Sequence, residues 1–134
     1  MPHYDPSKAE GGFDPIPAGT YRCKFTDVTD KNKEGAVLKS KSGDEMFSIR
    51  LTVIEGEHEG AVIYDYLVFG GKGLNRVKIL LGALGFDNEK ALDVTTGMIQ
   101  DQTVRVDIIQ TVYEGKAQNK VAFAGYKADE TPSF

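Results

Sequence analysis

Apolar and polar residues alternate along three segments of the chain, which is typical of strands that bury one face. The first segment begins at Gly19, the second covers residues 47–53 and the third covers residues 104–108. Cys23 has the apolar parity of the first segment, and Arg50 has the polar parity of the second. We therefore predict three half-buried strands, with Cys23 as a small residue of the core and Arg50 facing outward.

Two further strands are predicted from apolar runs without a clean alternation. Residues 62–69, VIYDYLVF, form a nearly continuous apolar and aromatic run, which indicates a strand buried on much of both faces or one that bends around a barrel. The run does not show whether Tyr64 and Tyr66 face outward. After the hairpin connection YEGKAQNK, Val121 and Phe123 mark the last strand.

One amphipathic helix is predicted between the third and fourth strands. Leucine and valine recur at helical spacing over residues 74–84, after the glycines of FGGKG, and Gly85 supplies a C-terminal stop. A further helical turn is expected at residues 88–92.

This order of elements predicts a mainly β fold. Three strands, a helix and a final hairpin are the order of the five-stranded oligonucleotide/oligosaccharide-binding (OB) barrel, with one helix between strands 3 and 4. We assign residues 19–127 to the OB-fold domain, residues 1–18 to an extended N-terminal lead-in and residues 128–134 to a short acidic C-terminal tail. An immunoglobulin-like sandwich is the alternative fold, and the well-marked helix argues against it.

The positive charge of the chain is concentrated in one connection. The formal net charge is -4, but residues 31–43 sum to +3, so the remaining residues carry -7. The final hairpin connection adds Lys116 and Lys120 against Glu114. An OB barrel brings these two connections to one side of the molecule, which predicts a local basic groove on an otherwise acidic protein.

A basic groove that follows the phosphates, together with aromatic rings on which bases stack, is how proteins bind single-stranded nucleic acid. The predicted phosphate contacts are Lys31, Lys33, Lys39, Lys41, Arg50, Lys72, Lys116 and Lys120. The predicted stacking residues are drawn from Tyr64, Tyr66, Tyr113 and Tyr126, the last two of which have the polar parity of their strands. The other interpretation is a solvated lysine loop and tyrosines that belong to the core.

The motifs that would indicate catalysis or a metal are incomplete. FGGKGLNRVK places glycines before a helix but lacks the GxxxxGK[ST] pattern of a nucleotide-hydrolysing P-loop, so only Lys72 is kept, as a backbone contact. EGEHEG offers one histidine, and no second cluster completes a ligand set. We expect no enzyme activity, no metal and no cofactor. Because the chain lacks a membrane-spanning apolar run and a signal-peptide pattern, we expect an intracellular protein.

Four segments together resemble a family of small phage-encoded proteins that was first catalogued as a domain of unknown function and is associated with single-stranded DNA binding. These segments are FDPIPAGTYRCKF, MFSIRLTVIEGEHEGAVIYDYLVF, LNRVKILLGALGF and TVRVDIIQTVYEGKAQNKVAFAGY. The resemblance covers the chain from about Tyr4 to Tyr126. It implies an OB-fold protein that coats single-stranded DNA without base specificity during phage replication or recombination, in the cytoplasm of the infected bacterial host.

The last residues, DETPSF, resemble in kind the acidic, phenylalanine-terminated tails with which bacterial single-stranded DNA-binding proteins recruit other replication proteins. The predicted partner contacts are Asp129, Glu130 and Phe134. Ser133 separates proline from phenylalanine and the tail is very short, so a frayed terminus is the other interpretation.

Two functional hypotheses from different classes follow. The first is a non-catalytic, sequence-tolerant single-stranded DNA-binding protein. The second is a protein-interaction module, an adaptor or inhibitor that binds no nucleic acid and uses the acidic surface and the C-terminal tip. The sequence does not decide between DNA and RNA, nor does it determine the site size or whether strand edges pair into a homo-oligomer.

Overall fold

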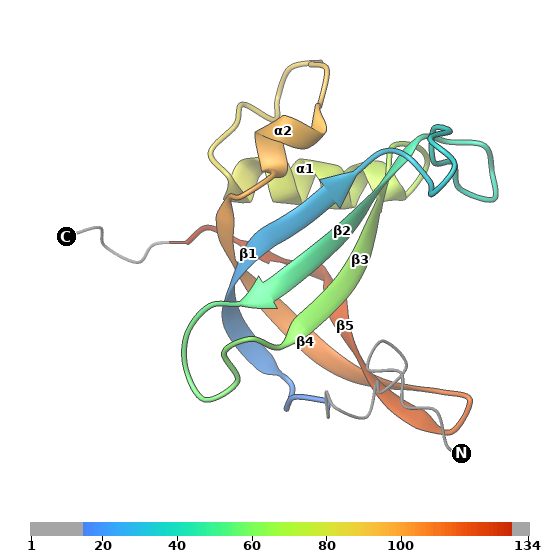
Figure 1. Cartoon of the computed structure of the whole chain (residues 1–134). Helices are drawn as coiled ribbons and strands as arrows, with labels where there is room; N and C mark the ends of the chain where they lie inside the picture. The colour runs from blue at the N-terminus through green and yellow to red at the C-terminus, as the bar shows by residue number, and fades with distance from the viewer. Residues whose placement is uncertain (1–14, 130–134) are drawn as a thin grey trace.

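The structure, a computed structural model, describes residues 15–129 and is mainly β (Figure 1). Its elements are β1 (Gly19–Thr29), β2 (Met46–Val53), β3 (Val62–Val68), α1 (Gly73–Ala83), α2 (Thr96–Ile99), β4 (Thr103–Tyr113) and β5 (Lys116–Lys127). The predicted order of three strands, a helix and two strands is confirmed. Neither helix within residues 15–129 has the length and apolar character that crossing a membrane requires.

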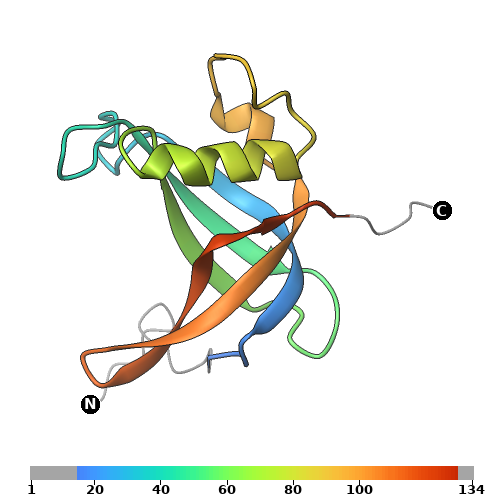
Figure 2. The same ribbon diagram turned by 180° about the vertical axis from the view of Figure 1, so that it is seen from behind.

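The strands form one five-stranded antiparallel sheet in the order β3-β2-β1-β4-β5. Two packed sheets are therefore not formed by the described residues, and the alternative of an immunoglobulin-like sandwich is wrong. The sheet is strongly coiled, with α1 lying across one end of it (Figures 1 and 2). This coiling encloses the core between the inner face of the sheet and the two helices.

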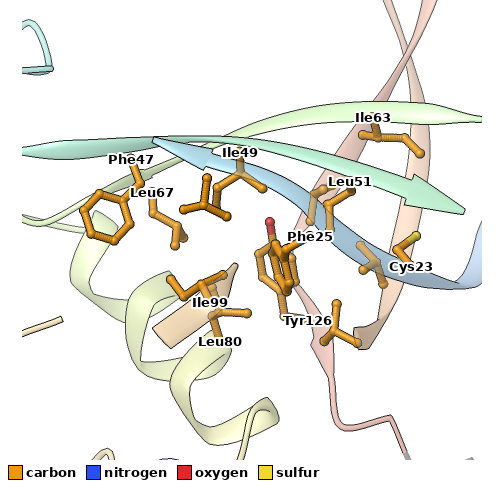
Figure 3. Packing of buried hydrophobic residues seen from close by; sticks show 14 of the residues in the cluster. Cys23, Phe25, Phe47, Ile49, Leu51, Ile63, Leu67, Leu80, Ile99 and Tyr126 are labelled. Atoms are coloured by element: carbon orange, nitrogen blue, oxygen red, sulfur yellow. The ribbon is translucent and has the colours of Figure 1, made fainter. Parts of the chain in front are cut away.

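The alternating segments bury the faces that their sequences predict. Cys23 and Phe25 of β1 are fully buried, and the alternating apolar positions over residues 47–53 of β2 and 104–108 of β4 are buried as well. From the helices, Leu80 of α1 and Ile99 of α2 pack onto this layer (Figure 3). Burial of each large apolar side chain contributes about 1.5–3 kcal/mol, so this face of the sheet is the main source of stability.

Helix α1 begins and ends close to the predicted residues. Gly85 adopts a φ of 86°, a left-handed conformation that favours glycine and ends the helix. The predicted helical turn at residues 88–92 is wrong, and the short second helix is α2 instead. The Asn88 side chain donates a hydrogen bond to the Lys78 carbonyl of α1 at 2.9 Å, which ties this segment to the helix in an irregular conformation.

The regular pairing of β4 with β5 is interrupted beside Asp107. The register pairs on either side are Ile108 with Val121 and Val106 with Tyr126. Four residues of β5, 122–125, therefore lie opposite the single Asp107. Strand side chains alternate between the two faces with a period of two. Because three is an odd number, the three additional residues reverse which side chains of β5 face the core after the irregularity.

The reversal overturns the predicted orientation of Tyr126 and places Phe123 at the surface. Tyr126 was expected to face outward, but it is 3% exposed and its ring lies 5.9 Å from that of Phe25 in the core (Figure 3). Phe123, which marks this strand together with buried Val121 and shares its parity, is 57% exposed. Both differences follow from the three additional residues of β5.

The segment before β1 is partly integrated into the fold. Ile16 is buried, its backbone N–H donates to the Asn119 side-chain oxygen at 2.9 Å, and its carbonyl accepts from Asn119 and from Gln110. Part of the predicted lead-in, residues 1–18, is thus fixed against β4 and β5. Residues 1–14 of it lie outside the described part of the chain.

Side chains connect β3 with β5, the two edge strands of the sheet. Arg76 of α1 forms two hydrogen bonds with the Asp65 carboxylate of β3, at 2.6 and 3.1 Å, and Asp65 also accepts one from the Tyr126 hydroxyl of β5 at 2.5 Å. Arg76 donates further to the carbonyls of Tyr66 on β3, at 3.0 Å, and of Phe123 on β5, at 3.2 Å. One guanidinium group therefore holds the two edges near each other.

Candidate nucleic-acid interface

Strand β3 presents Tyr64 and Tyr66 to solvent. Ile63 and Leu67 are buried on the inner face, whereas Tyr64 is 67% exposed and Tyr66 is 54% exposed. The tyrosine rings therefore stand on the outer face of the sheet, which answers the question of parity that the apolar run left open. Asp65, between them, points inward and is held by Arg76.

Arg50 lies beside this pair of tyrosines. The register of β2 and β3 places Arg50 directly opposite Tyr64, so the two side chains share the outer face. The Arg50 Nε donates to the Thr26 hydroxyl of β1 at 3.2 Å, and no carboxylate of the described residues lies within ion-pair distance of the guanidinium. An exposed guanidinium beside an exposed ring can contact a phosphate while the ring stacks on a base.

The basic connection between β1 and β2 is built from two successive turns. In the first, the Asn32 side-chain oxygen accepts from the N–H groups of Glu34 and Ala36, at 2.8 and 3.0 Å. In the second, the Ser40 and Asp44 backbones pair, with Gly43 at a φ of 86°. These turns carry four exposed lysines, Lys31, Lys33, Lys39 and Lys41. We refer to residues 30–45 as the lysine loop.

The base of the lysine loop is joined to the end of β3. The Phe69 N–H donates to the Glu45 carbonyl at 2.9 Å, and a side chain at Gly70 would collide with the Asp44 carboxylate. Exposed Lys72 follows at the start of α1, and Figures 1 and 2 both show the loop beside this end of the helix. The structure therefore brings Lys72 to the same end of β3 as the lysine loop.

The connection between β4 and β5 is shorter than predicted. Glu114 and Gly115 adopt φ values of 50° and 78° and make a two-residue turn, so that Lys116 already belongs to β5. The register places Lys116 opposite Tyr113 and Lys120 opposite Ile109. Tyr113, Lys116 and Lys120 consequently share one face of a projecting hairpin, because side chains alternate along each strand.

The lysine loop and this hairpin lie at the two ends of β3. Both project toward the same side of the molecule, with β3 between them (Figures 1 and 2). The prediction that the two basic connections meet on one side is thus correct for their direction. They flank the strand with Tyr64 and Tyr66 rather than forming one continuous cluster.

Most cations of this surface lack an acidic partner, the exception being Lys31, which has Asp30 at 4.0 Å. Within residues 15–129, the cations with an acidic group within 4.0 Å are Arg22, Lys24, Lys31, Arg76, Lys78, Arg105 and Lys127. Those with no such partner are Lys33, Lys39, Lys41, Arg50, Lys72, Lys90, Lys116 and Lys120. All of the second group except Lys90 were predicted phosphate contacts. Cations without a carboxylate partner are the ones available to neutralise phosphate.

Tyr126 does not belong to this surface. Burial, followed by the charge and hydrogen bond of Asp65, raises the pKa of its hydroxyl well above the ordinary value. Its ring lies within the core, and the Arg76 guanidinium carbon is 5.9 Å from the ring centroid. Stacking of a base on Tyr126 would require the core to open, so the prediction that it is a stacking residue is wrong.

The predicted partner contacts divide between the fold and the residues beyond it. The Asp129 side chain is 8% exposed, forms an ion pair with Arg22 at 2.8 Å and accepts from the Thr103 hydroxyl at 2.9 Å. Asp129 is thus part of the folded domain, and the prediction that it belongs to a free C-terminal tail is wrong. Glu130 and Phe134 lie outside the described residues.

Phe123 is the exposed aromatic residue that sequence reasoning missed. It shares parity with buried Val121, and regular alternation along β5 would place it in the core. The signal that could have found it is the segment AFAG, in which small residues surround one large ring, because a tight irregularity needs small side chains. Gly125 confirms the crowding, since a Cβ there would lie 2.9 Å from the carbonyl oxygens of Ala122 and Asp107.

These features define a small, mainly β protein with an exposed aromatic strand flanked by cations that lack acidic partners. The chain belongs to the family described as protein of unknown function (DUF669), whose model matches residues 2–133. No curated protein matches the chain in sequence.

Proposed function

We propose that this protein binds single-stranded DNA without base specificity, through the outer face of β2 and β3 and the two basic connections beside it. Phosphates contact Arg50 and the unpaired lysines of the two basic connections and of the start of α1, and bases stack on Tyr64, Tyr66 and Tyr113. The role is non-catalytic. On the family resemblance of its sequence, we place it in phage DNA replication or recombination, in the cytoplasm of the infected host.

The arrangement of strands supports an OB barrel as the scaffold. The sheet order β3-β2-β1-β4-β5, with α1 between β3 and β4, is the order of that fold with its closure between β3 and β5. In this chain the two edges are linked by Arg76, Asp65 and Tyr126. OB barrels bind oligonucleotides over strands 2 and 3 and the loops beside them, which is where the unpaired cations and exposed rings lie.

The observation that carries the proposal is the coincidence of two independent features on one surface. Of the exposed aromatic residues among residues 15–129, every one lies on β3 or on the β4–β5 pair. Nearly all the cations without an acidic partner flank the same strands. Stacking contributes about 1–3 kcal/mol per base, and phosphate neutralisation supplies the sequence-independent remainder of the affinity.

The test is fluorescence anisotropy of a labelled oligothymidine, titrated with the full chain at low and at moderate salt. A duplex of equal length is the control. We expect binding to the single strand that weakens with salt, and much weaker binding to the duplex. Tyr66→Ala should lower the affinity by about 5- to 150-fold, whereas Tyr66→Phe, which keeps the ring, should bind like the wild type.

Absence of binding to either nucleic acid at low salt would overturn the proposal. The protein-interaction module would then be the remaining hypothesis. Equal affinity for duplex and single strand would also contradict the proposal, because stacking on exposed rings requires unpaired bases.

A further inference from the structure

The bulged segment of β5, residues 122–125, exposes one large ring on a fixed backbone. Phe123 is 57% exposed, while Val121 and Tyr126 on either side are buried. Its carbonyl accepts from Arg76 Nε at 3.2 Å, and Gly125 permits the close backbone contacts that fold the segment back. The ring is therefore presented from a backbone that hydrogen bonds hold in place.

The same guanidinium group places Phe123 next to Tyr66. Arg76 donates from Nη1 to the Tyr66 carbonyl at 3.0 Å and from Nε to the Phe123 carbonyl. The backbones that carry these two exposed rings are thus joined across the seam between β3 and β5. Asp65 holds the guanidinium in this position through two further hydrogen bonds, and Arg76 cannot turn away without leaving that carboxylate unpaired.

We propose that Phe123 is a further base-stacking residue and that the bound strand crosses from β3 over the Arg76 seam onto β5. This proposal rests on the proposed function and adds to it a residue and a path. Arg76 acts as a positioning residue, because its hydrogen-bonding groups are engaged with protein carbonyls and with Asp65. From Phe123 the path continues toward the hairpin with Tyr113, Lys116 and Lys120.

Single exposed apolar residues are common on protein surfaces, so the exposure of Phe123 alone would not indicate a binding site. Phe123 differs because it belongs to a group. The exposed aromatic residues among residues 15–129 are Tyr64, Tyr66, Tyr113 and Phe123. They occupy β3, the strand β5 that faces it across the seam, and the hairpin that joins β4 to β5.

The chain contains no tryptophan, which makes a direct test possible. Phe123→Trp introduces a single indole whose fluorescence a stacked base quenches. Tyr66→Trp is the positive control, and Leu92→Trp, at an exposed position in the connection from α1 to α2, is the negative control. Each variant is titrated with unlabelled oligothymidine while anisotropy of a labelled oligomer measures its affinity.

We expect quenching for Phe123→Trp and Tyr66→Trp at the same DNA concentrations, and none for Leu92→Trp. Phe123→Ala should bind about 5- to 150-fold more weakly, with an unchanged salt dependence, because no charge is removed. Quenching of Tyr66→Trp without quenching of Phe123→Trp, in a variant that still binds, would overturn this inference and leave the proposed function standing. Absence of binding by the wild type would overturn both.

Discussion

Arg76 of α1 and Asp65 of β3 form a nearly buried ion pair, in which Nη2 of Arg76 lies 2.6 Å from Oδ2 of Asp65. Their side chains are 16% and 10% exposed. Burial alone would lower the pKa of the Arg76 guanidinium, but the hydrogen bonds and the charge of Asp65 outweigh burial and raise that pKa. The pair also organises the surface, since Arg76 binds the backbones of Tyr66 and Phe123. Stability and the candidate interface therefore depend on the same group.

Replacement of Arg76 by methionine should destabilise the fold strongly. Removing one partner of a buried pair leaves an uncompensated charge, which costs about 3–5 kcal/mol. Lys78→Met is the matched control on the same helix, because Lys78 and its partner Glu89 are both exposed and 3.6 Å apart. That change should cost less than about 1 kcal/mol. Urea denaturation measures both losses, and equal losses would contradict the structural role of Arg76.

Tyr126→Phe should reduce stability without affecting DNA binding. The variant loses the hydroxyl that donates to Asp65 at 2.5 Å, and a hydrogen bond to a charged group contributes about 1.5–3 kcal/mol. Tyr21→Phe removes an exposed hydroxyl bonded to the Pro17 carbonyl and should cost less. Urea denaturation and the anisotropy titration together check this prediction. A large loss of affinity in a folded Tyr126→Phe protein would mean that the hydroxyl of Tyr126, through its hydrogen bond to Asp65, takes part in binding after all.

Charge reversal in the lysine loop should weaken DNA binding and flatten its salt dependence. Lys39→Glu with Lys41→Glu removes two cations that have no acidic partner. For a single strand, the slope of log affinity against log salt should fall by about 0.7 for each phosphate that the variant no longer neutralises. Lys78→Glu with Lys90→Glu changes the net charge equally at exposed positions on α1 and on the connection from α1 to α2, neither of which is a predicted phosphate contact. If both pairs weaken binding equally, the effect comes from total charge and the lysine loop is no specific contact.

Cys23 should be inert in the native protein and should make stability fall at alkaline pH. Burial raises the pKa of its thiol from 9.0 to about 12. The unfolded chain loses this proton near pH 9 while the folded chain retains it, so the stabilisation is present below pH 9 and is lost as the pH rises toward 12. We expect no alkylation by iodoacetamide at about pH 8 until the protein is unfolded.

The control for that prediction is Cys23→Ala, which should show a weaker loss of stability between pH 9 and pH 12 than the wild type. Tyr126 titrates in the same direction in both proteins, but its contribution cancels only in part, because the charge of Cys23 is one of the causes that raise the Tyr126 pKa. Rapid alkylation of the native thiol under the same mildly alkaline conditions would show that β1 opens locally, contrary to the complete burial of Cys23.

The sequence predicts elements well where one physical signal dominates. Alternation over residues 21–25, 47–53 and 104–108 identifies the buried faces of β1, β2 and β4 correctly, because each of these segments is apolar on one side only. Helical spacing and Gly85 locate α1 to within a residue. The exposed lysines were also predictable, since four lysines in one polar connection cannot be buried.

The remainder depended on contacts between distant parts of the chain. The apolar run of β3 has no alternation, so its sequence does not set the direction of Tyr64 and Tyr66. Their outward direction follows from the pairing of Asp65 with Arg76 of α1 on the inner face. Asp129 likewise has partners far away in sequence, in Arg22 and Thr103.

By itself, then, the sequence determined the order of the elements, the inner faces of three strands and the concentration of lysines between β1 and β2. These features are local, because each follows from side-chain chemistry within one segment. Only the tertiary structure decided which rings are exposed. Three additional residues in β5 place Tyr126 in the core and Phe123 at the surface. The pairing of β5 with β4 sets this register, so it cannot be predicted from the sequence of β5 alone.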